Sequence, residues 1–282
     1  MARTDLRPFF SSEHSAAAGR ASVRLAEFAP FFGFEIDDPR LGEVAFPVRR
    51  IKAGESLVRA GDPFDAIYFV RCGFFKTVRV DEAGNEVVLA LPMTGEAIGL
   101  DGLDPGHYTA DVVALDTSLV AAVPFAQLAH LGRENASIER ALFRAFSRAL
   151  GREHSMICLL GTLSAEARVA SFLLDLSDRF GRLGYSRTDF ALRMTRQEIG
   201  SYLGLKLETV SRTFSALAAS GAIGVDRKTI TINDLAALQA IMQPKGEEPE
   251  MRPAPGAVRA QGAHRPSPRL AREARGRALA FA

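Results

Sequence analysis

The sequence predicts an α+β protein with a β-rich N-terminal domain, a long helix and a small, mainly helical C-terminal domain. Short apolar runs separated by Gly, Asp and Pro fill residues 45–125, which is typical of an all-β barrel or sandwich. Apolar residues then recur at helical spacing from residue 137 to residue 160. Because 282 residues exceed the usual size of one hydrophobic core, we expect two compact domains.

The clearest strands of the β-rich domain are residues 66–72, 74–80 and 86–91. The second and third are separated by Asp81-Glu82-Ala83-Gly84-Asn85. Gly84 and Asn85 tolerate positive φ, so this segment predicts a turn that joins two antiparallel strands.

An apolar ridge runs along the long helix at helical spacing. Its members are Ile138, Leu142, Ala145, Phe146, Ala149, Leu150, Ile157 and Leu160. Such a ridge needs a partner. The pattern is equally compatible with a helix packed on its own β-domain and with a helix paired with its copy in a dimer.

The C-terminal domain begins after residue 163. Helical spacing predicts helices within residues 165–180 and 195–219, and residues 222–232 read as a hairpin around Asp226-Arg227-Lys228. Beyond residue 243 the chain is rich in Pro, Ala, Arg and Glu without periodicity, which predicts a disordered tail.

Residues 195–219 contain the signals of two helices joined by a tight turn. Thr195 and Glu198 are spaced as a capping box, which predicts a helix start at this point. Gly204 can adopt positive φ and end that helix, and a second helix can begin within three residues. This order predicts a helix-turn-helix.

The second helix has two chemically different faces. The apolar face carries Val210, Phe214 and Leu217, and another face carries Glu208, Ser211 and Arg212. Arg212 can donate to guanine O6 and N7, and Glu208 can accept from the cytosine amino group, so this face suits base edges in a major groove. The alternative is a surface ion pair between Glu208 and Arg212.

Donors for DNA phosphates surround this face on three flanking elements. They are Arg196, Gln197, Lys206, Thr213, Arg227 and Lys228. Together with the base-reading set they predict double-stranded DNA as the partner, although the formal net charge of the chain is only +2.

The stretch Thr195-Arg-Gln-Glu-Ile-Gly-Ser-Tyr-Leu-Gly-Leu-Lys-Leu-Glu-Thr-Val-Ser-Arg212 resembles the winged helix-turn-helix of the CRP/FNR family of transcription regulators. The resemblance extends to Leu91-Pro-Met-Thr-Gly-Glu-Ala-Ile-Gly-Leu-Asp101 and to Ala114-Leu-Asp-Thr-Ser-Leu-Val-Ala-Ala-Val-Pro-Phe125, and it spans residues 30–240. It implies a homodimer that acts with RNA polymerase. The expected dimer interface is formed by the ridge residues Ile138, Leu142, Phe146, Ala149, Leu150, Ile157 and Leu160. Our readings of strands, ridge and helices agree with this architecture.

The resemblance also implies three domains within the part of the chain that it spans. They are a cyclic-nucleotide-binding-like β-roll sensor domain (30–135), a dimerisation helix (136–163) and a winged helix-turn-helix (164–237). Residues 1–29 are then expected to form an N-terminal extension, and residues 243–282 the tail.

The base-reading set looks like that of the FNR branch rather than that of the cyclic-AMP receptor branch. The latter usually carries Arg where Leu207 stands and Gly where Ser211 stands. The implied operator is therefore an inverted repeat of TTGAT half-sites. Lys206 departs from the pattern, because Thr or Ser commonly caps the recognition helix at this position.

The effector does not follow from the resemblance. Cyclic-nucleotide members use an Arg for the phosphate, whereas this chain has Gly99-Leu100-Asp101 and Tyr108-Thr109, so an anionic ligand is disfavoured. Oxygen-sensing members hold an iron-sulfur cluster through several cysteines, and this chain has only Cys72 and Cys158. A cyclic-nucleotide-responsive regulator and a haem-based nitric-oxide sensor, through the lone His107 or His154, are the alternatives.

Other classes of function lack support in the sequence. It contains no nucleophile elbow, P-loop, dinucleotide fingerprint or metal-spaced His/Glu cluster, so we expect neither an enzyme nor a metal site. No segment reaches the ~18 consecutive apolar residues of a membrane span, and no signal-peptide pattern is present. We therefore expect a cytoplasmic protein without a membrane partner.

Overall fold

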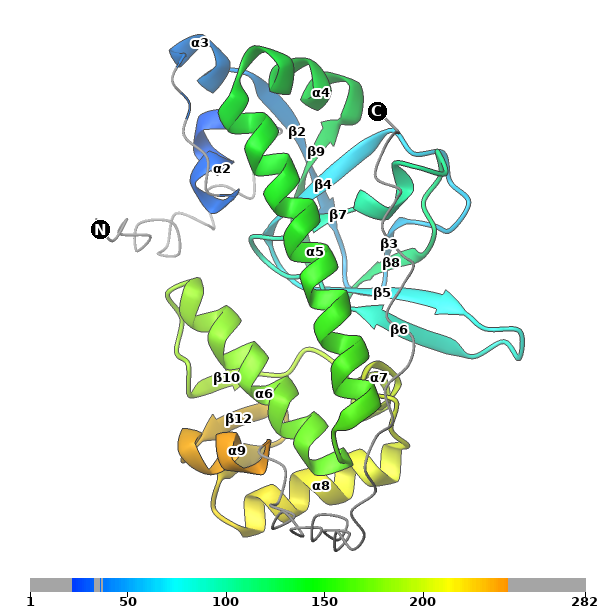
Figure 1. Cartoon of the computed structure of the whole chain (residues 1–282), viewed down its shortest axis with the longest axis vertical. Coiled ribbons are helices and arrows are strands. Elements are labelled where there is room, and N and C mark those ends of the chain that lie inside the picture. The colour runs from blue at the N-terminus through cyan, green and yellow to red at the C-terminus, as the bar shows by residue number, and fades with distance from the viewer. Residues whose placement is uncertain (1–21, 33–35, 37, 243–282) are drawn as a thin grey trace, which may run out of the picture. The chain divides into compact units, whose positions relative to one another are not determined.

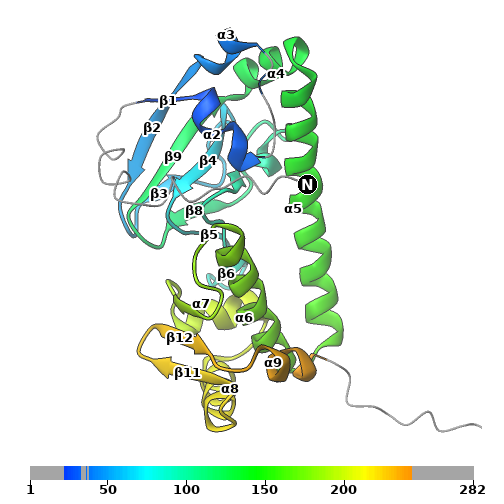
Figure 2. The ribbon, with the colours of Figure 1, turned by 90° about the vertical axis from the view of Figure 1, so that its left-hand side faces the viewer.

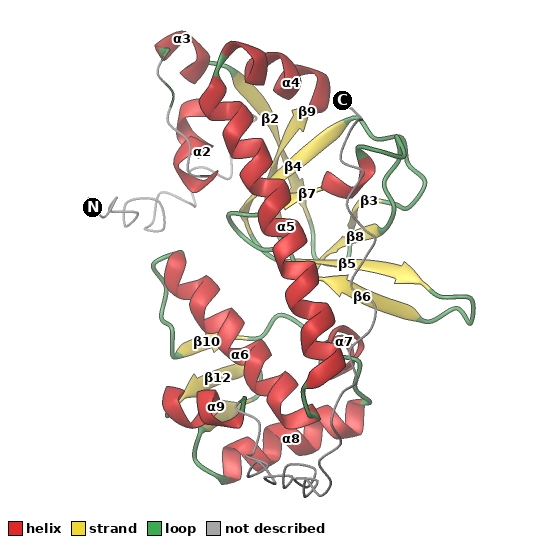
Figure 3. Ribbon diagram, in the orientation of Figure 1, coloured by secondary structure: helices red, strands yellow, loops and turns green. Residues whose placement is uncertain are grey.

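The computed structural model describes residues 22–32, 36 and 38–242. Within them the chain forms a β-domain, a long helix and a C-terminal domain of helices and short strands (Figures 1 and 3). The predicted α+β fold class is confirmed. The predicted tail, residues 243–282, lies outside the described residues.

Two antiparallel sheets form the described part of the β-domain. The first has the order β1 (Ser22–Arg24), β2 (Ala45–Ile51), β9 (Ser118–Pro124), β4 (Ala66–Cys72) and β7 (Ala97–Ile98). The second has the order β3 (Ser56–Val58), β8 (Asp111–Ala114), β5 (Phe75–Val80) and β6 (Glu86–Ala90). In the second sheet β6 is an edge strand.

The turn between β5 and β6 forms as predicted. The Asp81 carboxylate accepts hydrogen bonds from the backbone N–H groups of Ala83 and Asn85, at 2.9 and 2.8 Å. Gly84 has a φ of +83°, a value that glycine adopts without strain. Phe46, Ile67 and Phe75, which strands β2, β4 and β5 place inside, are fully buried.

Short helices complete the β-domain. They are α2 (Leu25–Phe32), α3 (Pro39–Gly42), the 3-10 helix η2 (Leu100–Gly102) and α4 (Phe125–Glu134). The domain begins before the expected boundary at residue 30, because β1 pairs with β2 and Val23 and Leu25 are each 1% exposed. A three-residue strand is too short to show an alternating pattern in the sequence.

The long helix α5 (Ala136–Thr162) follows α4 and runs along the β-domain toward the C-terminal domain (Figure 2). Asn135 caps it, since its side chain accepts from the N–H groups of Ser137 and Ile138. The first turns of α5 pack on the β-domain, where Ile138 is 2% and Ala141 7% exposed.

The C-terminal domain contains four helices and a three-stranded sheet among the described residues. The helices are α6 (Ala165–Arg182), α7 (Arg196–Leu203), α8 (Leu207–Ala219) and α9 (Leu235–Ile241). The sheet has the order β10 (Asp189–Ala191), β12 (Thr229–Ile232) and β11 (Ile223–Asp226). The predicted hairpin is confirmed, whereas β10 and α9 were not predicted. Leu238 of α9 is fully buried, so this domain extends past residue 237.

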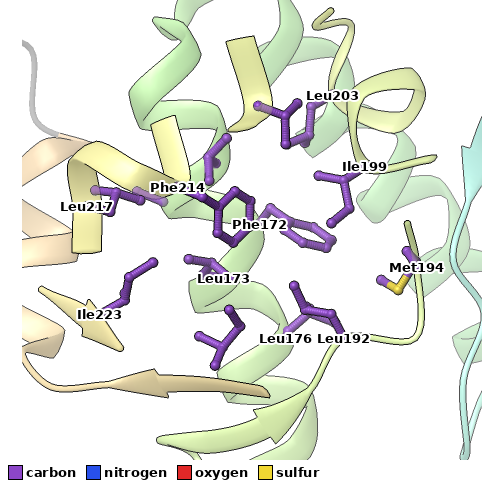
Figure 4. Packing of buried hydrophobic residues seen from close by; sticks show 14 of the residues in the cluster. Phe172, Leu173, Leu176, Leu192, Met194, Ile199, Leu203, Phe214, Leu217 and Ile223 are labelled. Atoms are coloured by element: carbon purple, nitrogen blue, oxygen red, sulfur yellow. The ribbon is translucent and has the colours of Figure 1, made fainter. Parts of the chain in front are cut away.

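One apolar core joins the helices of the C-terminal domain (Figure 4). Phe172 and Leu173 of α6, Ile199 of α7, and Phe214 and Leu217 of α8 meet in it, each 3% exposed or less. Burying such side chains contributes about 2 kcal/mol each to folding. The core therefore fixes α8 against α6 and α7.

Strands β5 and β6 contact the first helix of the helix-turn-helix. The Val88 N–H donates to Ser201 Oγ at 2.9 Å, and that hydroxyl donates to the Glu86 carbonyl at 3.1 Å. Lys76 Nζ lies 3.0 Å from Glu198 Oε1. The β-domain therefore contacts α7 directly. None of the described helices is both long and apolar enough to cross a membrane.

Candidate nucleic-acid interface

The start of α7 is fixed by the capping box that the sequence predicts. Thr195 Oγ1 accepts from the Glu198 N–H at 3.2 Å, and Glu198 Oε2 accepts from the Thr195 N–H at 2.7 Å. Burial raises the pKa of Glu198, but hydrogen bonds from Thr195 and Lys76 outweigh it, and the net pKa is lowered. The Glu198 carboxylate thus takes part both in the cap of α7 and in the ion pair with Lys76 of the β-domain.

The turn between α7 and α8 depends on two glycines. Gly204 ends α7 with a φ of +62°, as its sequence position predicts. Gly200 was not singled out in the sequence, yet a Cβ there would lie 2.6 Å from the Leu205 carbonyl oxygen. The Leu205 N–H donates to the Gly200 carbonyl at 2.8 Å. The turn therefore packs directly on α7 and leaves no room for a side chain at residue 200.

Arg196 links the two helices. Its guanidinium lies over the Phe214 ring, 3.3 Å from the ring centroid. Burial lowers the pKa of Arg196, and its Nη1 is buried without a hydrogen-bond partner among the described residues. Arg196 therefore takes part in packing α7 on α8, and the phosphate contact predicted for it stays a prediction.

Helix α8 presents the two faces that its sequence predicts. Val210, Phe214 and Leu217 are 0%, 3% and 1% exposed. Glu208, Ser211 and Arg212 are exposed, and no ion pair joins Glu208 to Arg212 in the described part of the chain. The surface ion pair that was the alternative reading is not formed. Both side chains are thus left available to a ligand.

Leu207 begins α8 beside these residues and is 45% exposed. Sequence reasoning did not include it in the site. A large apolar side chain at the exposed N-terminus of a helix is a signal that could have found it, because thymine methyl groups line the major groove.

Four of the six predicted phosphate donors are exposed around α8, namely Gln197, Lys206, Arg227 and Lys228. The structure does not support the predicted phosphate contact of Thr213. This residue is only 9% exposed, because it lies three residues after Val210 and four before Leu217, on the buried side of α8. Lys206 occupies the N-cap position of α8 without a side-chain capping bond, as predicted.

The ridge of α5 divides between two environments. Ile138 belongs to the β-domain core and Leu142 packs against it, so neither lies on an exposed surface. Phe146 and Ala149 are half-buried. Leu150, Ile157 and Leu160 are 54%, 68% and 37% exposed, and so is Phe143 at 63%, which the predicted ridge had omitted.

The candidate effector residues lie in both the β-domain and the long helix. Cys72 on β4 and Cys158 on α5 are the only cysteines of the chain, and they do not fit an iron-sulfur cluster, which usually takes four thiolates. Within the described residues no three His, Cys, Asp or Glu side chains gather as metal ligands. The Asp101 carboxylate accepts hydrogen bonds from the Thr109 N–H and hydroxyl. A negative charge therefore lies between the two segments, 99–101 and 108–109, that replace the phosphate-binding residues of cyclic-nucleotide members.

Comparisons with known proteins agree with this geometry. Residues 48–135 match the cyclic nucleotide-binding domain family, and residues 167–241 match the Crp-like helix-turn-helix domain family.

Two curated relatives are similar along most of their length. The chain is 37% identical to the transcriptional regulatory protein btr of Bordetella pertussis over 203 residues, which cover 72% of this chain and 84% of btr. It is 34% identical to the fumarate and nitrate reduction regulatory protein of Salmonella typhimurium over 212 residues, which cover 75% of this chain and 85% of that protein.

The fold resembles the solved structure of FixK2 from Bradyrhizobium japonicum. The TM-score is 0.66 at 24% sequence identity, over 72% of this chain and all of FixK2. At this identity the likeness concerns the fold.

Proposed function

This chain belongs to the CRP/FNR family of DNA-binding transcription regulators, and we propose that it binds, as a homodimer, an inverted repeat of TTGAT half-sites. The observation that carries the proposal is the exposed face of α8, where Glu208, Ser211 and Arg212 stand without an ion pair between the two charged groups. These side chains have the donors and acceptors that base edges in a major groove require.

The phosphate contacts are proposed for the exposed donors around α8. Gln197 stands at the start of α7, Lys206 precedes α8, and Arg227 and Lys228 form the tip of the β11–β12 hairpin. Contacts of this kind fix the orientation of a protein on the duplex and depend on salt, whereas the face of α8 supplies the sequence preference.

The dimer is supported by the exposed side of α5. Phe143, Leu150 and Ile157 are spaced by seven residues, and Phe146 and Leu160 follow the first and last of them by three. This is the spacing with which two helices pair in a coiled coil. A partner helix would cover side chains that the subunit alone leaves exposed or half-buried. We define Phe143, Phe146, Leu150, Ile157 and Leu160 as the proposed seam.

DNA binding is tested by titrating the full chain against three duplexes: the inverted TTGAT repeat, a single half-site and a scrambled repeat. We expect binding to the repeat to exceed binding to the scrambled duplex by about a thousandfold at physiological salt. Equal binding to the repeat and the scrambled duplex would contradict the proposed operator.

The dimer is tested with Ile157→Glu and the matched control Ser155→Glu. Both residues are exposed on α5, and two positions place them on nearly opposite sides of the helix. Ile157→Glu puts a charge into the proposed seam, so we expect a monomer in sedimentation, whereas Ser155→Glu should remain a dimer. If both variants sediment as the wild type does, the seam is wrongly placed.

A regulator bound at an operator acts through the transcription machinery. We therefore propose RNA polymerase as the second partner and the cytoplasm, where the bacterial chromosome lies, as the location. In vitro transcription from a promoter that carries the inverted repeat, with and without the protein, tests the first point. No change in transcript level would contradict it.

A further inference from the structure

Arg168, in the first turn of α6, connects the ends of two other helices. Its Nη2 donates to the Leu160 carbonyl of α5 at 2.6 Å, and its Nε donates to the carbonyl of Leu163, the C-cap of α5, at 3.0 Å. Its Nη1 donates to the carbonyl of Leu203, the last residue of α7, at 3.1 Å. One guanidinium therefore holds three carbonyls from the C-terminal ends of two helices.

The charge of Arg168 is favourable for the C-terminal ends of α5 and α7, but not for its own helix. The last carbonyls of a helix lack intrahelical partners and carry partial negative charge, so a cation stabilises them. At its own position, near the N-terminus of α6, a cation is disfavoured by the dipole of that helix. The ends of α5 and α7 thus supply the interactions that account for an arginine at residue 168. The planar fork of arginine also allows three separate donors to act at once.

The contact lies where the long helix meets the helix-turn-helix turn. A Cβ placed on Gly204 would lie 3.4 Å from Arg168 Nη1 and 3.3 Å from Leu160 Cδ2. Leu160 belongs to the proposed seam, and α8 begins three residues after Gly204. Arg168 therefore stands between the element that would join two subunits and the helix that would read DNA.

We propose that Arg168 is a positioning residue that fixes α8 relative to α5 and thereby sets the half-site spacing that the dimer accepts. The inference rests on the proposed function, because only a dimer that reads two half-sites has a preferred spacing. Half-sites one helical turn apart are about 34 Å from centre to centre, so the two recognition helices must be held at a matching distance.

The test uses operators in which the distance between half-sites varies in steps of one base pair. Each step moves one half-site by about 3.4 Å along the axis and turns it by about 35°. A rigid wild-type dimer should bind one spacing best and lose affinity sharply on either side. In Arg168→Met the three hydrogen bonds are lost, and we expect the ratio between the best and neighbouring spacings to fall about tenfold.

Two further variants separate positioning from stability. Arg140→Met removes an arginine whose Nε also donates to a backbone carbonyl, that of Ala136, but within α5 alone. It should keep the sharp profile. Arg168→Lys keeps the charge with a single donor group and should give an intermediate profile, and it decides the question if Arg168→Met does not fold.

The outcomes distinguish this inference from the proposed function. A wild-type chain that binds no spacing of the repeat would contradict the proposed function itself. A wild-type chain with a sharp profile that Arg168→Met and Arg168→Lys both retain would overturn the positioning role alone, even if both variants bind more weakly at every spacing. Loss of stability by itself lowers affinity equally at all spacings.

Discussion

The two helices of the helix-turn-helix differ in how much of their surface the rest of the chain holds. Helix α7 is capped by its own box, contacts β6 through Ser201, pairs with Lys76 through Glu198 and ends on Arg168. Helix α8 is held by one face only, and its N-cap residue makes no capping bond. This difference supports a division in which α7 holds the motif in place and the exposed face of α8 is left for the proposed reading of bases.

The comparison has a measurable consequence. A change on α7 should alter the geometry that all DNA sequences share, whereas a change on the outer face of α8 should alter preference among sequences. The following four changes test this division in order of decreasing effect.

Gly200→Ala should have the largest effect. The new methyl group would meet the Leu205 carbonyl oxygen at 2.6 Å, so the turn between the helices must shift. We expect the free energy of unfolding to fall by about 3 kcal/mol, with weaker binding to every operator. Thermal or urea unfolding measures the first effect.

Gly151→Ala on α5 is the matched control, because open space surrounds that helical glycine. Alanine there should raise the free energy of unfolding by about 1 kcal/mol. A stable Gly200→Ala variant would show that α7 tolerates movement.

Arg212→Ala should leave the fold intact, because the side chain is exposed. Loss of a guanine contact should weaken operator binding by about 2 kcal/mol and relax preference at one base pair. Lys228→Ala, on the hairpin, should instead weaken all sequences alike and lower the salt slope by about one. Titration against single-base operator variants at two salt concentrations separates the two. Uniform weakening by Arg212→Ala would assign that residue to a phosphate.

Thr195→Ala removes the side-chain half of the capping box of α7. The Glu198 N–H then loses its acceptor at the helix start, and we expect a loss of about 1 kcal/mol in the free energy of unfolding. Denaturant unfolding measures it, and Thr195→Ser, which keeps the hydroxyl, is the control. Equal losses in both variants would mean that the hydroxyl of Thr195 does not account for the loss.

Lys206→Ser should give the smallest change and the opposite sign. A serine can supply the capping bond that α8 lacks, so the free energy of unfolding should rise by about 0.5 kcal/mol. DNA binding should fall slightly at low salt, since one proposed phosphate donor is lost. Lys206→Ala, which loses the charge without gaining a cap, separates the two effects. If serine and alanine give the same stability, α8 needs no cap.

The features of the candidate interface that depend on residues close together in the chain could be predicted from the sequence. The capping box at Thr195, the end of α7 at Gly204 and the two faces of α8 each depend on residues within one or two helical turns. The buried position of Thr213 was also readable from its spacing to Val210 and Leu217, and its assignment as a phosphate donor neglected that spacing.

Other features depend on contacts that periodicity does not report. The pattern of the ridge on α5 does not tell a residue buried by its own β-domain, such as Ile138, from one left exposed, such as Ile157. Gly200 matters because of a carbonyl across a turn, and Lys76 because of a carboxylate 122 residues later in the chain. These contacts become visible only when distant segments are brought together.

The hydroxyl of Ser201 also bears on aggregation. A β-strand at the edge of a sheet offers unpaired N–H and C=O groups to any other strand, and β6 is such an edge. Ser201 satisfies the Val88 N–H and the Glu86 carbonyl on that edge, much as a neighbouring strand would. Val87 and Leu89 beside them are 37% and 44% exposed. Without the C-terminal domain this edge would lose both hydrogen bonds, so we expect the isolated β-domain to self-associate through β6 more readily than the full chain.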